Sequence, residues 1–316
     1  MARALPAIPE VSEAAADAAT RAIYEDIKRV TGVPLVNLVY RHLATLPGAL
    51  AWAWRTVRDG YAAGEVAARA AALRASVDQG DVTPLSGAGF RLLGLDKRAI
   101  DDIGAVVETY NVGNSLNLVA LTALRLVVEG RARKRSGAGV IEVVAPPVVL
   151  RRRRALLPLP ALAALTPSAL EQVLWLNRLG ETRAPREIAS LYRHLAHWPA
   201  YLALIGGLLL PLDASGKLAA IRDRARREAE RLAAPLAARL ARATPGPPPS
   251  SLLPVLARFT TTVIPKMLGI GALLAAAMPQ SLTPRAPRLK RPAAVSHAHR
   301  KPRLRPRGSR RRARAR

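Results

Sequence analysis

The chain has 316 residues, half of them apolar, which is enough to build one large domain or two average ones. It contains no cysteine, which excludes a disulfide-stabilised fold, a catalytic thiolate and a zinc or iron–sulfur site with cysteine ligands. The 49 Lys and Arg outnumber the 22 Asp and Glu and give a net charge of +27, a balance typical of proteins that bind polyanions.

The predicted elements are helices throughout. Ala, Leu, Arg and Glu dominate, and only 4% of the residues are aromatic, so the composition predicts an all-α fold. Residues 18–31 place Ile23, Ile27 and Val30 on one helical face. Residues 36–59 continue as helix with a break near Pro47, because proline removes a backbone hydrogen bond. We expect further helices at residues 64–78, 96–111, 116–129, 167–179, 185–196, 199–209, 214–243 and 255–277.

Three segments are predicted to lie outside the helices. Residues 130–160 contain glycines, a Pro-Pro pair and four consecutive arginines, and they show no sustained helical period. Residues 244–251 are so rich in proline that an irregular or polyproline loop is expected. Residues 284–316 hold fourteen Lys or Arg, about half of the excess charge, and no acid. With few large apolar side chains, this tail is predicted to be disordered.

A short sequence motif occurs twice. Tyr40-Arg-His-Leu-Ala44 recurs as Tyr192-Arg-His-Leu-Ala196, and Pro47 matches Pro199 at the same offset of 152 residues. At an offset of 149 residues, Tyr110 corresponds to Phe259. We therefore predict two related helical repeats, residues 1–130 and 161–283, joined by a linker at 131–160 and packed as a pseudo-dimer.

Several segments, taken in order, resemble one family of proteins. They are IYEDIK at residues 23–28, VP at 33–34, LATLPG at 43–48, WR at 54–55, GLD at 94–96, YNVGN at 110–114, LTAL at 121–124, AS at 189–190, LA at 195–196, WP at 198–199 and RF at 258–259. This pattern resembles the group I 2-haloacid dehalogenases. The resemblance extends over residues 20 to 280, apart from the central linker.

The resemblance implies an all-helical hydrolase, built from two repeats, that removes halide from short 2-haloalkanoic acids without a metal or an organic cofactor. Water attacks C2 directly, on either enantiomer, with no ester intermediate. In the family an aspartate acts as general base and an asparagine positions the water. The asparagine matches Asn114. The aspartate would follow Ala189-Ser190, where this chain has Leu191.

The same resemblance indicates a substrate site formed by Leu35, Leu38, Asn111, Ser190 and Leu191 near Asn114. His194 lies one helical turn after Leu191 and leans back toward it, so it is our candidate for a replacement base. However, His42 occupies the equivalent place in the first repeat, which favours a packing role for both. Gly113-Asn114 is also consistent with a turn between two helices.

The missing aspartate leaves a second function open: a catalytically inactive relative that binds a small carboxylate or an apolar ligand. His194 and His197 have helical spacing but no third ligand, so we predict no metal site. The apolar stretches at 200–212 and 267–278 are shorter than the roughly 20 residues of a membrane span, so we predict no membrane association and a cytoplasmic location. The basic tail predicts nonspecific polyanion binding that weakens with salt.

Overall fold

The computed structural model describes residues 7–77, 82–132, 150, 154–181, 185–244 and 246–279. These residues form helices and connecting segments with no strand among them, so the predicted all-α fold is confirmed. The predicted linker at 131–160 lies largely outside the described residues, and the basic tail at 284–316 lies entirely outside them.

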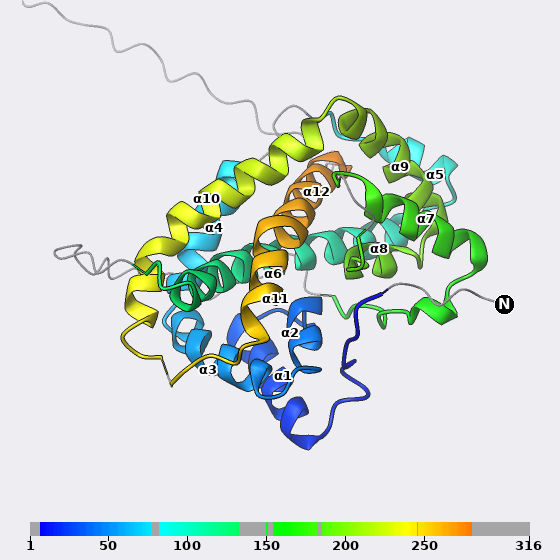
Figure 1. Cartoon of the computed structure of the whole chain (residues 1–316). Helices are drawn as coiled ribbons and strands as arrows, with labels where there is room; N and C mark the ends of the chain where they lie inside the picture. Colours follow the sequence, from blue (N-terminus) through cyan, green and yellow to red (C-terminus); the bar gives the residue numbers. More distant parts are fainter. Residues whose placement is uncertain are drawn as a thin grey trace, which may run out of the picture. The chain divides into compact units, whose positions relative to one another are not determined.

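Among the described residues, the first half of the chain forms six helices, α1 to α6 (Figure 1). The first, α1, spans Ala18–Thr31 as predicted, with Asp17 as its N-cap and Gly32 in the left-handed conformation at its end. The others are α2 (Leu38–Leu43), α3 (Ala49–Ala62), α4 (Glu65–Val77), α5 (Gly87–Leu92) and α6 (Lys97–Val128). The predicted break near Pro47 is present between α2 and α3, while the short helix α5 is an addition to the predicted elements.

The second half of the chain contains the remaining helices. After a 3-10 turn at Leu162–Ala164 come α7 (Pro167–Arg178), α8 (Ser190–Leu195), α9 (Pro199–Ala214) and α10 (Lys217–Leu240). Helix α11 (Leu252–Arg258) then runs through a π-helical turn, η2 (Phe259–Val263), into α12 (Ile264–Ala277). The six-residue helices α2 and α8 hold the repeated YRHL motif. That the two halves are packed as a pseudo-dimer stays a prediction.

Several predicted boundaries were wrong, and two of them concern the segments that enclose the site. Residues 97–128 form one continuous helix, α6, where two helices were predicted, so the turn predicted at Gly113-Asn114 does not occur. Residues 185–189 are not helical, and only residues 190–195 of the predicted second-half helix are. Asn177 holds this segment open, because its side chain donates to the Glu187 carbonyl at 2.9 Å and accepts from the Ala189 N–H at 3.0 Å.

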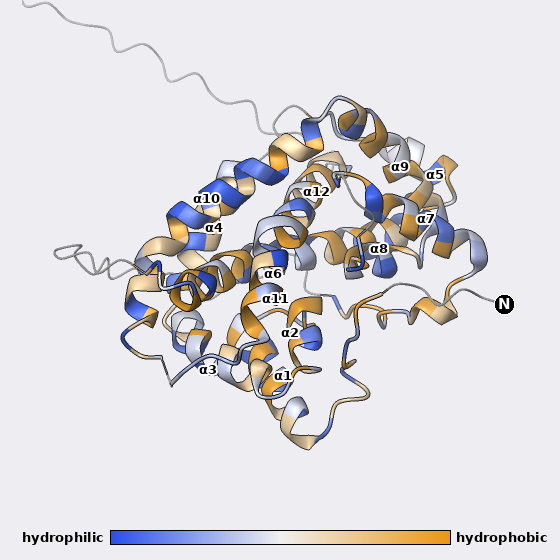
Figure 2. Cartoon of the chain, in the orientation of Figure 1, coloured by the Kyte–Doolittle hydropathy of each residue, from blue (hydrophilic) through white to orange (hydrophobic). Residues whose placement is uncertain are grey.

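The long helix α6 packs against α12, and α10 contacts both of them, while α4 contacts α6 and α10. Figure 2 shows α6 and α12 as largely apolar and α10 with a hydrophilic outer side. Two helical stretches, Lys97–Val128 and Leu252–Ala277, are long and apolar enough to cross a membrane, in contrast to the short stretches expected from the sequence. Their apolar windows are 83% and 72% buried within the fold, so packing accounts for much of their apolar character.

Candidate functional site

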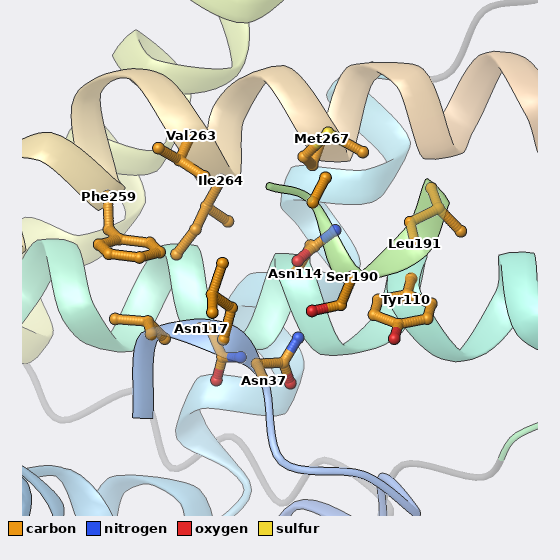
Figure 3. A pocket seen from close by; sticks show the side chains of 13 residues that line it. Asn37, Tyr110, Asn114, Asn117, Ser190, Leu191, Phe259, Val263, Ile264 and Met267 are labelled. Atoms are coloured by element: carbon orange, nitrogen blue, oxygen red, sulfur yellow. The ribbon is translucent and has the colours of Figure 1, made fainter. Parts of the chain in front are cut away.

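A small cavity lies where α6, α8, the start of α2 and the η2–α12 segment meet (Figure 3). It offers about 40 Å³ to the centres of water-sized molecules. One water needs about 10–15 Å³ measured in this way, so the cavity has room for a few waters or for a molecule of a few non-hydrogen atoms. The lining residues are Asn37, Leu38, Val39, Tyr110, Asn114, Asn117, Ala189, Ser190, Leu191, Phe259, Val263, Ile264 and Met267.

Two opposite walls of the cavity differ in polarity. Tyr110, Asn114 and Asn117 follow one another at helical spacings of four and three residues, so they lie on one face of α6 and form a polar wall. The η2–α12 wall, shown above them in Figure 3, is apolar and comes from Phe259, Val263, Ile264 and Met267. A ligand in this cavity therefore meets hydrogen-bonding groups on one side and hydrocarbon on the other.

Two tripeptides related by the 152-residue offset complete the cavity. They are residues 37–39 (Asn-Leu-Val), which lead into α2, and residues 189–191 (Ala-Ser-Leu), which lead into α8. Asn37 lies close to α6, because a Cβ atom added at Gly113 would lie only 3.1 Å from its Oδ1. A glycine inside the long helix thus permits the close approach of the Asn37 amide.

Two of the three cavity asparagines have free amides. Asn37 and Asn114 are 9% and 8% exposed, and neither side chain has a hydrogen-bond partner within the described ranges. Asn117 differs, because its Oδ1 accepts a hydrogen bond from the Tyr61 hydroxyl at 2.9 Å. Both amides line the cavity, and neither is among the fully buried polar atoms without a partner, so they are accessible there to a polar ligand or to water.

Ser190 connects the cavity to a buried cation. The Arg41 guanidinium donates to Ser190 Oγ at 2.8 Å, across 149 residues of sequence. Arg41 is only 3% exposed, and the sequence interpretation assigned it no role. Ser190 also lies close to Tyr110. Burial raises the pKa of the Tyr110 hydroxyl, and the positive charges of Arg41 and Arg193 and the interaction with Ser190 partly oppose that rise.

His194 lies behind Tyr110 and is not part of the cavity lining. Its Nε2 contacts the Leu157 carbonyl, and its Nδ1 lies 3.1 Å from the Tyr110 hydroxyl. Because a carbonyl only accepts, the geometry assigns the hydrogen to Nε2, which leaves Nδ1 to accept from Tyr110. The predicted replacement base therefore reaches the cavity only through the tyrosine hydroxyl, and both of its ring nitrogens are engaged.

Four of the seven candidate residues come together at the cavity, namely Leu38, Asn114, Ser190 and Leu191. Leu35, Asn111 and His194 are not among the lining residues. Asn111 lies close to Gly271 of α12, because a Cβ atom added at Gly271 would lie 3.4 Å from the Asn111 Oδ1 atom. This Oδ1 is buried and has no hydrogen-bond partner among the residues that the structure describes.

The sequence interpretation missed Asn37, Tyr110 and Asn117. A signal for the last two was available, because Tyr110 and Asn117 share the helical face of Asn114. Asn37 is the counterpart of Ala189 at the offset of 152 residues, so the repeat also pointed toward it.

The cavity lining contains no Asp, Glu, His, Lys or Arg. In the part of the chain that the structure describes, no group of three or more His, Asp or Glu is placed to hold a metal ion. The arrangement can bind a small polar molecule, offer amide and hydroxyl hydrogen bonds to it, and hold a water. It places no carboxylate or imidazole in contact with such a water.

Burial makes the stability of the fold sensitive to protonation of His194. Burial lowers the pKa of this imidazole below its ordinary value of 6.5, although the contact with the Leu157 carbonyl partly opposes the shift. Below pH 6.5 the unfolded chain therefore binds a proton that the folded protein resists. We expect the free energy of unfolding to decrease as the pH is lowered from 7.5 to 5.5, measured by urea denaturation.

In the His194→Gln variant, the free energy of unfolding is expected to decrease much less between pH 7.5 and 5.5 than in the wild type. His197→Gln, which alters an exposed neighbouring histidine, serves as the control and is expected to show the same decrease as the wild type. An equal slope for the wild type and His194→Gln would show that His194 does not cause the pH dependence.

Comparison with known proteins supports the resemblance inferred from the sequence. The chain is 29% identical over 203 residues to a configuration-inverting 2-haloacid dehalogenase from Alcaligenes xylosoxydans xylosoxydans. The matched region covers 62% of this chain and 66% of that relative. No protein-family model matches the chain.

Solved structures with the same fold are D-2-haloacid dehalogenases. A mutant in complex with D-2-CPA matches with a TM-score of 0.65 and 21% identity, and a further mutant structure matches with 0.67 and 21%. The complex with L-LA matches with 0.61 and 20% identity. Each match covers 85% of this chain and 96% of the other.

Proposed function

We propose that this chain, a group I dehalogenase-like protein, binds short 2-haloalkanoic acids in the cavity between α6, α8 and α12. Halide displacement from C2 by water then takes place slowly, because the position of the expected aspartate holds Leu191. The chain thus has the groups that bind a 2-haloacid and position the attacking water, but it lacks a general base beside that water.

One observation supports this proposal more than any other. Asn114 and the pair Ser190-Leu191 are far apart in sequence. Asn114 matches the family's asparagine and Ser190 matches the residue before the family's aspartate, while Leu191 occupies the position of that aspartate. In this chain they line the same small cavity. The free Asn114 amide faces a space of the size that a few-atom molecule needs.

The proposed complex uses each wall of the cavity for one part of the substrate. The carboxylate accepts hydrogen bonds from Ser190 Oγ and from the free Asn37 amide, and the Asn114 amide holds the attacking water. The apolar η2–α12 wall, including Val263 and Met267, surrounds the halide and leaves it weakly solvated. Leu191 excludes water without offering a proton acceptor.

A second candidate function is binding without turnover. One observation favours it: no carboxylate or imidazole is present among the cavity-lining residues. A general base is worth about 10² to 10⁴ in rate, so a chain without one would retain the ligand and release halide at a rate close to that in solution. Binding alone is common to both candidates, and it is therefore the first property to test.

The test measures binding of both enantiomers of 2-chloropropionate to the full chain by isothermal titration calorimetry. We expect binding to the wild type and loss of binding in Ala189→Leu, because the larger side chain fills the cavity that Ala189 lines. Ala62→Leu adds the same atoms at an exposed position of α3 and is expected to bind as the wild type does.

The variants are compared only after thermal melting shows that each is folded. Failure of the wild type to bind either enantiomer would refute the proposed function. Unchanged affinity in a folded Ala189→Leu would show that the acid binds elsewhere. Polyanion binding by the tail stays a separate prediction about residues outside the described part of the chain.

A further inference from the structure

Two arginines from equivalent positions of the repeated motif share one carboxylate. Glu10 Oε2 accepts from Arg41 Nε at 2.9 Å, and Glu10 Oε1 accepts from Arg193 Nη1 at 2.7 Å. Arg41 comes from α2, Arg193 from α8, and Glu10 from the extended segment before α1. This arrangement, called the Glu10 cluster below, consists of Glu10, Arg41 and Arg193.

The Glu10 cluster carries an unbalanced positive charge inside the protein. Each guanidinium group contributes one positive charge, because arginine side chains are cations in proteins. Burial raises the pKa of Glu10, but Arg41 and Arg193 outweigh this effect and lower it overall, so the carboxylate is ionised. The side chains of Arg41, Arg193 and Glu10 are 3%, 8% and 22% exposed. Two cations and one anion leave a net charge of +1.

The neighbouring groups do not remove this charge. Arg193 directs its other N–H groups to the Pro160 carbonyl, at 3.1 and 2.8 Å, which adds no formal charge. Glu13 lies on the same N-terminal segment and pairs with Lys28 at 3.0 Å, and Lys28 also pairs with Glu25 at 2.7 Å. The extra negative charge of this group lies on Glu25, whose side chain is 64% exposed, so water and salt screen it. His194, which faces Arg41 and Arg193, has its pKa lowered mainly by burial and is neutral near pH 7.

Ser190 lies between the positively charged Glu10 cluster and the cavity. Its Oγ accepts from Arg41 Nη2 at 2.8 Å, so its own hydrogen is directed elsewhere, toward Tyr110 or a ligand. The remaining polar groups of the cavity wall are neutral amides and a phenol. A carboxylate in the cavity therefore meets a hydroxyl donor backed by a buried cation, and low polarity strengthens this attraction.

We propose that the Glu10 cluster makes the cavity selective for a monoanionic ligand, with Arg41 as a positioning residue that acts through Ser190. This inference rests on the proposed function and specifies its ligand: a short carboxylate binds, and a neutral amide of the same shape does not compete with it. The sign of the effect follows the net charge of the cluster.

The experiment compares the affinities of 2-chloropropionate and neutral 2-chloropropanamide for the full chain, by calorimetry at constant ionic strength. For the wild type we expect the acid to bind roughly 10- to 100-fold more tightly than the amide, the range for a hydrogen bond to a charged group. Arg41→Gln reduces the net charge to zero and is expected to bring the ratio close to equality. Glu10→Gln raises the net charge and is expected to increase the ratio.

Opposite shifts in Arg41→Gln and Glu10→Gln separate electrostatics from structural damage, since damage weakens both ligands in both variants. Glu25→Gln is the matched control, because it removes the same charge from an exposed carboxylate that pairs with Lys28, and its ratio of acid to amide affinity is expected to stay at the wild-type value. Ser190→Ala keeps all charges and the packing, so it remains informative where a charge variant does not fold. Its ratio is expected to fall.

The outcomes distinguish the two proposals. Acid and amide that bind equally well to the wild type would overturn the selectivity inference and leave the cavity as a binding site. A ratio that does not change in Ser190→Ala or in the folded charge variants would also overturn it. If neither ligand binds to the wild type, the proposed function itself fails.

Discussion

Replacing Leu191 by aspartate is expected to raise halide release from 2-chloropropionate by about 10² to 10⁴ over the wild type. Leu191 is buried at the start of α8 and lines the cavity beside Ser190. A carboxylate there would accept a proton from a water held by Asn114, which is the step that the present residues do not supply. Halide release is measured for both enantiomers at pH 7.5, where an ordinary carboxylate is ionised.

Leu191→Asn is the matched control for this gain. It places a side chain of nearly the same shape and polarity in the cavity, but an amide does not take up a proton at this pH. We expect its rate to equal that of the wild type. Equal rates for Leu191→Asp and Leu191→Asn would show that space or polarity limits turnover. A wild type already as fast as Leu191→Asp would mean that another base is at work, with the Tyr110–His194 pair the next residues to test.

Removing the Glu181 carboxylate is expected to destabilise the fold by about 3–5 kcal/mol, because it leaves the buried Lys266 ammonium without its carboxylate partner. Glu181 Oε1 lies 2.7 Å from Lys266 Nζ, and Oε2 lies 2.9 Å from Arg258. The side chains of Glu181 and Lys266 are almost fully buried. Lys266 also donates to the Asn177 carbonyl, so this cluster supports the residue that holds segment 187–189 open.

The free energy of unfolding of Glu181→Ala is measured by urea denaturation at several pH values. Burial lowers the pKa of Lys266, and Glu181 opposes this. Without Glu181 the folded protein releases the lysine proton more readily than the unfolded chain, so the loss of stability should shrink as the pH rises toward 10. Glu228→Ala breaks the exposed pair with Arg231 and is expected to cost only about 0.2–1 kcal/mol. An equally small cost for Glu181→Ala would contradict the structural role of the buried cluster.

Both experiments concern the same short segment of the chain. Residues 187–189 are not helical, and this conformation places Ala189, Ser190 and Leu191 at the cavity. Asn177 and the cations of α11 and α12 hold the segment in place, because Glu187 also accepts from Arg258 at 2.8 Å. Glu181→Ala, which breaks the contacts of Glu181 with Arg258 and Lys266, should therefore weaken ligand binding as well as lower the stability of the fold.

Local properties of the sequence determined the helical elements and the part of the site that lies on α6. Helix propensity and apolar periodicity depend on neighbouring residues, and so α1 has the predicted bounds and the break near Pro47 occurs. The same periodicity places Tyr110 and Asn117 on the face of Asn114, although the sequence interpretation used only Asn114. The family motifs are also short local patterns, so the sequence alone indicated Ser190 and Leu191 as site residues.

Tertiary packing decided the rest, because the contacts involved join residues that no local pattern relates. Helix α6 continues through Gly113 since the glycine leaves room for Asn37, and the helix predicted to begin at residue 185 begins only at Ser190 because Asn177 binds the preceding backbone. Arg41 meets Ser190 across 149 residues, and Arg193 meets Glu10 across 183. The placement of a charge beside the cavity thus depends on how the helices pack, which helix propensity and apolar periodicity do not encode.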